Sequence, residues 1–507
     1  MNQVNDKIGQ LIAQIRQERG LTQSEFAKKL STSQSAVNRI EKGKQNLSLE
    51  TLGRISDVLN KQLLNLSASN EVSLKIDGNT TLKGSIELKT SKNAAVALLC
   101  ASLLNFGVTK FKSFPRIEEV FRIIEVLESI GVNVKWVQND LEIRRPIKLK
   151  LDNINTSSAK KTRSVLMLIG SLMHEFSNFK IPYAGGCKLG ERTVAPHLFA
   201  LEEFGVNIKA QTGNYNISVK RKSPDDIVLY EAGNTVSNNV LLAAARSNGV
   251  VKIHGASGDY MVQDLAFFLQ KLGVEIDGIG TPFLKVKGIN HTIKKNVTYS
   301  PTEDPIEAMF FIASAIITNS KITVKRVPYK WIALELLKLN KMGLKFVKSE
   351  PYKAGNGIID LCDITIFQHN GNLVALSEKI HPNLFPGINP DNIPYFVLIA
   401  CAVNGRTLIH DWMFENRAVY YTELTKIGAQ IELVDPHRVY VTGPTKFSSA
   451  EVICPPALRP ASLLLIGMMA GKGMSTLRNV YTINRGYEDL SERLNSLGAN
   501  ITILHEI

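Results

Sequence analysis

One short phrase recurs six times along the 507-residue chain and constrains its fold more than any other feature. The phrase is a leucine, two variable residues, an apolar residue and a glycine, followed by alternating apolar residues. The copies begin, at spacings of 74, 68, 70, 85 and 70 residues, at Leu127, Leu201, Leu269, Leu339, Leu424 and Leu494. A glycine just past the last apolar position can take positive φ and end a helix, and period-two alternation indicates a strand. Each copy therefore predicts a helix end followed by a strand.

A period near 70 residues is too long for a thin solenoid, whose repeats run about 20–50 residues. Strands and apolar helices alternate between the copies, so we expect each unit to be a strand, a buried helix, a strand, an amphipathic helix and further strands. Six such units predict two α/β lobes of three units each. A cleft between lobes is a preferred place for a ligand.

The composition is that of a soluble globular chain, with 44% hydrophobic and 21% charged residues. No apolar run reaches the roughly 18 residues that a membrane helix needs, and the first residues do not resemble a signal peptide. We therefore expect a cytoplasmic protein without a membrane partner. The five cysteines are far apart and form no CxxC pair, so the sequence predicts neither a zinc site nor a disulfide framework, and nothing indicates an organic cofactor.

The chain is basic, with a formal net charge of +14 at pH 7. Residues 1–66 hold 10 Lys and Arg against 6 Asp and Glu, which leaves most of the excess on the remainder of the chain. Such a bias favours nucleic acid or small polyanionic substrates as partners. A merely basic surface fits the number equally well.

The first 66 residues have helical patterns and no strand pattern. Thr22 and Glu25 form a capping-box pattern that opens a helix, a turn follows at Ser31–Ser33, and a second helix runs to Gly43. Residues 48–60 predict one more helix. A helix, a tight turn and a helix that starts with polar residues suits docking in a DNA major groove.

This segment resembles the phage-repressor (xenobiotic-response-element) helix-turn-helix family over about 55 residues. By that resemblance Gln34, Ser35 and Asn38 face base edges, and the residues near phosphates are Gln23, Arg39, Lys42 and Lys44. A single copy would need a homodimer to read two half-sites. A helical dimerisation or protein-docking module remains the alternative. Residues 67–71 are small and polar and are expected to be a linker.

Four local patterns in the rest of the chain carry chemistry. Lys92 and Asn93 open a buried helix, where a cation beside helix amides makes an anion site, although a lysine at a helix end is often only solvated. Residues 184–192 contain three glycines and place Cys187 near Lys188 and Arg192, which favours a reactive thiolate over an inert buried thiol. Asp391 opens another buried helix, as a cap or as a general base.

The fourth pattern is a set of scattered arginines that could bind phosphate or carboxylate: Arg163, Arg417, Arg459 and Arg485. Each alone suits a surface ion pair. Their convergence on one cleft would indicate a multiply charged substrate.

The phrases SKNAA, GGCKLGER, FENR and RGYE, in this order, resemble the enolpyruvyl transferase family over residues 72–507. The similarity is greatest to members that act on UDP-N-acetylglucosamine. The family fold is two lobes, each an inside-out α/β barrel of three units, which agrees with the six phrases. The resemblance implies a helix-turn-helix domain at 1–66, one lobe at about 90–263, and a second lobe at about 72–89 plus 264–507.

The resemblance also implies the reaction: an acceptor hydroxyl attacks C2 of phosphoenolpyruvate, a proton goes to C3, and the adduct then loses phosphate. Lys92, Arg192 and Arg485 match the ligands of phosphoenolpyruvate, and Arg163 lies near its phosphate. The remaining matches are Cys187 (proton transfer and product release), Asp391 (candidate base), Asn93 (acceptor contact), and Arg417 and Arg459 (substrate binding).

Three positions depart from the family pattern. Ala457 replaces the acid of an Asp–Leu–Arg phrase, Ala195 replaces an Asp of the uridine-binding phrase, and Ala232 aligns with a lysine near the diphosphate. The residues that match the phosphoenolpyruvate ligands of the family are retained, whereas several that match its acceptor ligands are replaced. The expected function is therefore enolpyruvyl transfer to UDP-N-acetylglucosamine or a related nucleotide. A transcriptional regulator that senses a cell-wall precursor, and an enzyme of secondary metabolism, are the alternatives.

Overall fold

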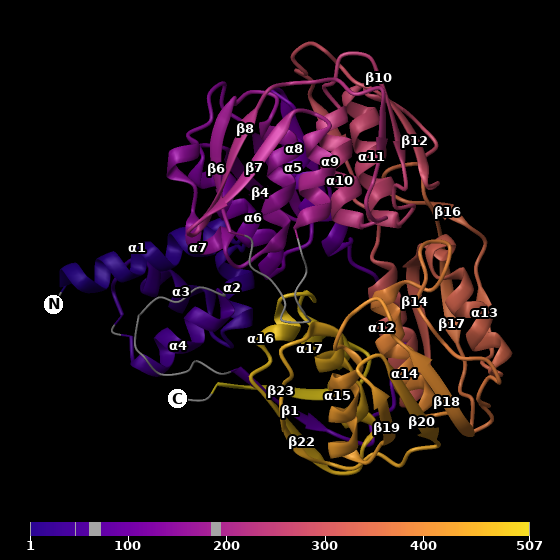
Figure 1. Ribbon diagram of the computed structural model, residues 1–507. Helices are drawn as coiled ribbons and strands as arrows, with labels where there is room; N and C mark the ends of the chain where they lie inside the picture. The colour runs from indigo at the N-terminus through magenta and orange to yellow at the C-terminus, as the bar shows by residue number, and fades with distance from the viewer. Residues whose placement is uncertain (1, 46, 60–71, 184–193, 506–507) are drawn as a thin grey trace.

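The computed structural model describes residues 2–45, 47–59, 72–183 and 194–505. Its N-terminal domain contains the three helices placed by the sequence, α2 (Gln23–Lys29), α3 (Gln34–Glu41) and α4 (Leu49–Val58), and a further helix before them, α1 (Asn2–Glu18) (Figure 1). The capping box forms, because the Thr22 hydroxyl accepts from the Glu25 amide and the Glu25 carboxylate accepts from the Thr22 amide. Phe26, Val37 and Ile55 lie in a small core of this domain's own. The expected linker lies outside the described residues.

The body, residues 72–505, contains six sheets among the described residues, three in each of two lobes. The first lobe holds sheets of strands β13 (Val297–Tyr299), β3 (Val108–Phe111), β5 (Asp140–Arg144) and β4 (Asn133–Val137); β6 (Asn178–Pro182), β8 (Asn214–Val219) and β7 (Val206–Gln211); and β11 (Glu275–Asp277), β12 (Phe283–Lys287), β10 (Val250–His254) and β9 (Asp226–Val228).

The second lobe repeats this plan. Its sheets are β21 (Glu451–Ile453), β22 (Met474–Arg478), β1 (Val72–Asp77) and β23 (Asn500–His505); β15 (Phe346–Lys348), β17 (Asp360–Ile366), β14 (Lys321–Val327) and β2 (Lys83–Glu87), with β16 (Tyr352–Lys353) paired to β17; and β18 (Gly405–His410), β20 (Arg438–Gly443) and β19 (Gln430–Asp435).

Helices fill the inside of each lobe and the sheets cover them. The first lobe contains α5 (Lys92–Ser102), α6 (Glu118–Ser129), η1 (Leu151–Asn153), α7 (Thr156–Ala159), η2 (Arg163–Met167), α8 (Leu168–Leu172), α9 (Ala195–Glu202), α10 (Asn234–Ala244) and α11 (Tyr260–Leu272). The second contains α12 (Pro305–Ile317), η3 (Tyr329–Trp331), α13 (Ala333–Lys341), η4 (Pro390–Asn392), α14 (Ile393–Ala400), η5 (Ala418–Ile427), α15 (Leu458–Ala470), α16 (Tyr481–Asn484) and α17 (Leu490–Ser496).

The burial pattern explains this inside-out arrangement. Every residue of α12 from Pro305 to Ile316 is buried, as expected for a helix that is apolar all round and packs against α14 and α15. Strands such as β12 alternate exposed and buried side chains, so one face covers the helices and the other faces solvent. Each lobe has its own core, and none of the sheets that the described residues form closes into a barrel.

The glycines of the six phrases confirm the predicted helix ends. All six have φ between +79° and +106°: Gly131, Gly205, Gly273, Gly343, Gly428 and Gly498. At Gly205 the packing also excludes a side chain, because an ideal Cβ would lie 1.9 Å from the Lys220 carbonyl oxygen. A strand follows each glycine, as the alternation predicts.

The chain returns to the second lobe later than the expected boundary at residue 263. Strands β11, β12 and β13 pair within first-lobe sheets, and the first core runs through Tyr299, beyond which the chain adds only Trp331, Ala354, Ile359 and Leu361 to it. The second core resumes at Ile306. The return therefore lies near residue 300, because the third unit keeps its last helix and strands. In the described part of the chain no helix has the length and apolarity needed to cross a bilayer.

Candidate active site

Three groups that are far apart in the sequence meet where the lobes face each other. Lys92 is the first residue of α5, and Arg485 is the residue that ends α16 in the other lobe. Between them lies Glu119 of α6, whose Oε2 atom is 3.3 Å from Nη2 of Arg485. The Thr162 hydroxyl donates to the other oxygen of Glu119 at 2.5 Å.

The charge of Lys92 also reaches Glu119. Burial alone would raise the pKa of the Glu119 carboxyl, but the positive charge of Lys92, the Thr162 hydroxyl and Arg485 together hold it below its ordinary value. The two cations thus face one buried carboxylate. A cluster that attracts one carboxylate from both lobes can also attract an anionic ligand.

A second cluster surrounds Asp391, in the turn η4 before α14. The Asp391 carboxylate is 3.5 Å from Nη1 of Arg417 and 3.4 Å from Nη2 of Arg459. Arg417 is fully buried, and its guanidinium also donates to Asp411 at 2.6 and 2.8 Å and to the Pro390 carbonyl at 2.6 Å. It therefore fixes the turn that carries Asp391.

Arg459, on the first turn of α15, is the other cation beside Asp391. Its Nη1 donates to the Tyr487 hydroxyl at 2.6 Å, two residues beyond Arg485 in the chain. Both clusters are thus connected through the short segment 485–487. The side chain of Asp391 keeps about a third of its surface exposed, so it remains accessible to an acceptor.

Polar contacts continue from this cluster into the first lobe. Asn93 Nδ2 donates to the Tyr260 hydroxyl at 3.4 Å. The neighbouring Asp259 caps α11 and accepts at 3.1 Å from Nδ2 of Asn389, which belongs to the second lobe. Burial raises the pKa of Asp259 to about 6, and the negative charge of Asp391 contributes. The two carboxylates, Asp259 in the first lobe and Asp391 in the second, are therefore close enough for their negative charges to repel each other across the lobe interface.

For the remaining site residues predicted from the sequence, the structure describes fewer contacts or none. Arg163 opens η2 directly after Thr162, and its charge acts on His197 of α9. Cys187 and Arg192 lie outside the described residues. Ala195 is the first residue of α9. Ala457 is the N-cap residue of α15, and without the family acid this position makes no side-chain hydrogen bond to cap the helix.

The helix-turn-helix candidates are exposed or half-buried. Gln34, Ser35, Arg39, Lys42 and Lys44 are exposed on and after α3, and Asn38 is half-buried. Gln23 is held in place at the start of α2: its amide donates to Glu41 at 2.8 Å and accepts from Gln34 at 3.2 Å. The exposed face of α3 is thus available to DNA.

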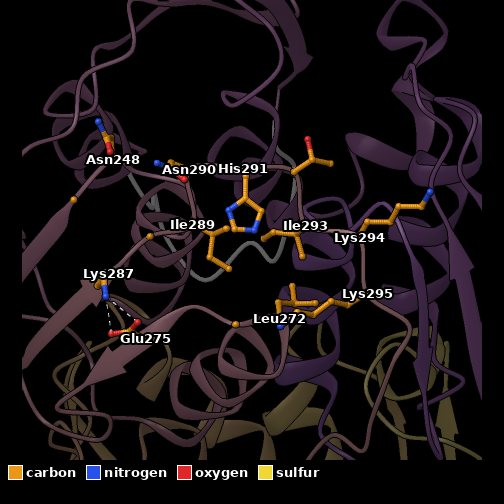
Figure 2. Close-up of a pocket in the computed structure, with 14 residues that line it drawn as sticks. Asn248, Leu272, Glu275, Lys287, Ile289, Asn290, His291, Ile293, Lys294 and Lys295 are labelled. Atoms are coloured by element: carbon orange, nitrogen blue, oxygen red, sulfur yellow. Dashed lines mark hydrogen bonds and ion pairs between the residues drawn. The ribbon is translucent and has the colours of Figure 1, made fainter.

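The structure also has a surface pocket of about 580 Å³ in the first lobe, between β12, the end of α11 and residues 288–295 (Figure 2). Lys287 pairs there with Glu275 at 2.9 Å, and His291 and Lys294 lie on the rim. No predicted site residue lines this pocket. In the described ranges no group of His, Cys, Asp or Glu is arranged to hold a metal ion.

Comparison with known proteins identifies the family. A model described as EPSP synthase (3-phosphoshikimate 1-carboxyvinyltransferase) matches residues 76–494, and a helix-turn-helix model matches residues 12–66. The chain belongs to this family of enolpyruvyl (carboxyvinyl) transferases and carries an N-terminal helix-turn-helix domain. Both resemblances found in the sequence are thereby confirmed.

Individual relatives agree. The UDP-N-acetylglucosamine 1-carboxyvinyltransferase of Campylobacter jejuni is 30% identical over 438 residues, which cover 85% of this chain and 99% of the relative. That of Treponema denticola is 29% identical over 428 residues, covering 84% and 98%. The crystal structure of the enolpyruvyl transferase NikO from Streptomyces tendae superposes with a TM-score of 0.72 at 20% identity, covering 86% of this chain and all of NikO, and supports the two-lobed fold.

Sequence reasoning missed three polar residues near the predicted site residues, namely Glu119, Asp259 and Tyr487. Glu119 had a detectable signal, since Glu118 and Glu119 open an amphipathic helix after a proline. Asp259 and Tyr487 had none, because a helix cap and a buried tyrosine are common and their partners come from other repeats. The contacts that the helix-turn-helix domain makes with the body were also not foreseen.

Proposed function

We propose that this protein transfers the enolpyruvyl group of phosphoenolpyruvate to a hydroxyl of UDP-N-acetylglucosamine or a related nucleotide. The observation that carries the proposal is the convergence of Lys92 and Arg485, from opposite lobes, on the single carboxylate of Glu119. Phosphoenolpyruvate is a trianion near neutral pH and needs several cations. Lys92, Arg485 and the neighbouring Arg163 are those that the described residues provide, and Arg192 is expected to join them.

The reaction would proceed by addition and elimination. The acceptor oxygen forms a bond to C2 of phosphoenolpyruvate while C3 gains a proton, and Asp391 takes the proton of the acceptor hydroxyl. The bond from C2 to the phosphate oxygen then breaks as C3 loses a proton, which restores the double bond and releases phosphate. Cys187 is expected to serve the proton transfers at C3, as the family resemblance implies.

Arg417 and Arg459 would act mainly through Asp391. Two guanidinium groups within 3.5 Å favour its ionised form, which is the form a general base needs. Arg417 is fully committed to protein partners and is better placed to position Asp391 than to bind substrate. Arg459 is buried beside Tyr487, and its positive charge would also attract phosphoenolpyruvate toward Asp391.

Fewer residues support the identity of the acceptor substrate than that of the donor. The relatives are UDP-N-acetylglucosamine 1-carboxyvinyltransferases, which favours UDP-N-acetylglucosamine as the acceptor. Ala195 and Ala232 stand where the resemblance places an acid and a lysine for the uridine nucleotide, which favours a modified acceptor or weaker binding. A free nucleotide or another nucleotide sugar is therefore the alternative substrate.

A mass-spectrometric screen tests the proposal. The full-length protein is incubated with phosphoenolpyruvate and each of several acceptors: UDP-N-acetylglucosamine, UDP-glucose, UMP and UDP. We expect an acceptor mass increase of one enolpyruvyl group with stoichiometric phosphate release. Absence of product and phosphate with all acceptors, at high enzyme concentration, would refute transferase activity. Product only with a free nucleotide would overturn UDP-N-acetylglucosamine as the acceptor and identify the alternative substrate.

A second function, regulation of transcription, is favoured by the exposed recognition helix. Gln34 and Ser35 are exposed at the start of α3, the end that enters the major groove in this class of domain. Two copies in a homodimer would read two half-sites. Selection of bound sequences from a random duplex pool tests this proposal; binding no tighter to any selected sequence than to the pool would refute it.

A further inference from the structure

The helix-turn-helix domain is attached to both lobes of the body, at the side where the lobes meet (Figure 1). Arg19, just after α1, is buried with its guanidinium 3.5 Å from Glu118 of the first lobe and 3.8 Å from the centre of the Phe121 ring. Lys29, the last residue of α2, donates at 2.5 Å to Asp489 of the second lobe. One folded domain thus bridges two others.

The attachment to the first lobe is closely packed. Gly20, in the turn between α1 and α2, has a φ of +67°, and an ideal Cβ there would lie 2.6 Å from the Trp136 side chain of β4. Arg116 stacks over the same Trp136 ring at 4.9 Å. This face of the domain is therefore fitted to the body and cannot slide freely along it.

Both attachment points adjoin the proposed donor site in the chain. Glu118, which holds Arg19, is followed directly by Glu119, which pairs with Arg485. Asp489, which holds Lys29, lies four residues after Arg485. Glu488 between them accepts at 2.9 Å from both the Arg116 amide and the Lys89 ammonium group. Segment 485–489 therefore connects the donor site, both lobes and the DNA-binding domain.

These contacts are compatible with one arrangement of the lobes. At the lobe separation of this structure the domain keeps Arg19 on the first lobe and Lys29 on the second, and a large change of that separation would pull at least one of these contacts apart. An arriving trianion would draw Lys92 and Arg485 away from Glu119 and repel that carboxylate, because like charges at close range are unfavourable. Segments 118–121 and 485–489 would then move relative to each other, and at least one attachment would break.

We propose that the helix-turn-helix domain is a strap that stabilises the ligand-free arrangement, and that phosphoenolpyruvate releases it. This inference rests on the donor site proposed above. Because coupling between two sites is reciprocal, the strap weakens phosphoenolpyruvate binding by the same factor by which phosphoenolpyruvate weakens docking of the domain. The DNA-facing residues Gln34, Ser35 and Asn38 take no part in the attachment, so release changes the position of the DNA-binding face without covering it.

The test measures, in the full-length protein, the effect of phosphoenolpyruvate on docking of the domain and the effect of docking on phosphoenolpyruvate binding. Hydrogen–deuterium exchange is followed over α1 and α2 with and without saturating phosphoenolpyruvate, and the phosphoenolpyruvate Kd is measured by calorimetry. The strap variants are Lys29→Gln and Asp489→Asn, and the matched control is Lys28→Gln, an exposed neighbour on the same helix. Both strap residues lie outside the proposed catalytic and binding machinery, and circular dichroism checks that each variant folds.

We expect phosphoenolpyruvate to accelerate exchange of the α1–α2 amides at least about fivefold, and both strap variants to bind it at least about fivefold more tightly than Lys28→Gln. Saturable binding of phosphoenolpyruvate with unchanged exchange, or equal Kd values in all variants, would overturn the strap and leave the transferase proposal intact. Absence of any binding would overturn both.

Discussion

Arg485 and Glu119 are 366 residues apart in the chain, yet their side chains form an ion pair of 3.3 Å that joins the two lobes. Lys92 acts on the same carboxylate. The cations that the family resemblance assigns to the donor are thus already neutralised in part by a residue of the protein. Glu119 is the group with which phosphoenolpyruvate would compete.

Substitution Glu119→Gln should therefore tighten phosphoenolpyruvate binding. Removing the competing negative charge is worth roughly 1–2 kcal/mol at a partly screened site, so we expect a Kd about 5- to 30-fold lower by calorimetry. The ligand-free variant should also melt at lower temperature, because Lys92 and Arg485 lose a buried partner. Glu125→Gln is the control, since that carboxylate on the same helix contacts Arg122 and Ser158 within the first lobe. Weaker binding by Glu119→Gln would show that Glu119 supports the donor.

Substitution Asp391→Asn should separate chemistry from binding. An amide keeps the size and polarity of the side chain but cannot accept the acceptor proton, so kcat should fall at least about 100-fold. The Kd for phosphoenolpyruvate should change less than threefold, because the donor cations are untouched. Asp435→Asn on the surface of the same lobe serves as the control. Rates are measured by phosphate release, and a kcat close to wild type would remove Asp391 from the role of base.

Ala457 offers a test of the missing family acid. It caps α15 without a side-chain hydrogen bond, so either Ala457→Ser or Ala457→Asp supplies a cap acceptor, worth about 0.5–2 kcal/mol. Only the aspartate adds an ionisable group beside the site. We expect both variants to melt at higher temperature, and Ala457→Asp alone to raise kcat. An equal kcat in both variants would show that this enzyme does not use an acid at that position.

Local patterns predicted much of this protein because they act within one unit. The six glycine phrases predicted helix ends that all adopt positive φ, and the capping box at Thr22 formed as expected. The lobe boundary at 263 was misplaced because no local signal marks the strand, β13, that pairs back with β3. The start of the helix that carries Glu119 had a signal in the sequence, but its pairing with Arg485 could not be predicted, since the pairing depends on how units hundreds of residues apart pack together. The contacts of Arg19 and Lys29 with the body were hidden for the same reason.

His197 should make stability depend on pH. Burial, with a contribution from the charge of Arg163, lowers the pKa of His197 to about 4 from the ordinary 6.5. Between pH 4 and pH 6.5 the unfolded chain therefore binds more protons at His197 than the folded chain does. The contribution of the neutral His197 to the free energy of unfolding is complete above pH 6.5 and is lost as the pH falls toward 4. Between pH 7 and pH 5 the free energy of unfolding should fall by about 2 kcal/mol less in His197→Gln than in wild type. Urea titrations at both pH values measure it, with the exposed His291→Gln as the control; equal changes in both variants would contradict the assignment.

Asn38 on α3 and Lys42 directly after it should affect DNA binding differently. Asn38→Ala removes a side chain expected at base edges, so it should lower affinity for a selected operator by roughly 1–3 kcal/mol while leaving binding to random duplex unchanged. Lys42→Ala, expected at a phosphate, should weaken both alike and reduce the slope of log affinity against log salt concentration by about one. Fluorescence anisotropy across a salt series measures both quantities, with Lys285→Ala on the exposed face of β12 as the control. Equal losses on operator and random DNA for Asn38→Ala would mean that Asn38 contributes to binding without reading sequence, as expected of a phosphate contact, and would contradict its assignment to base edges.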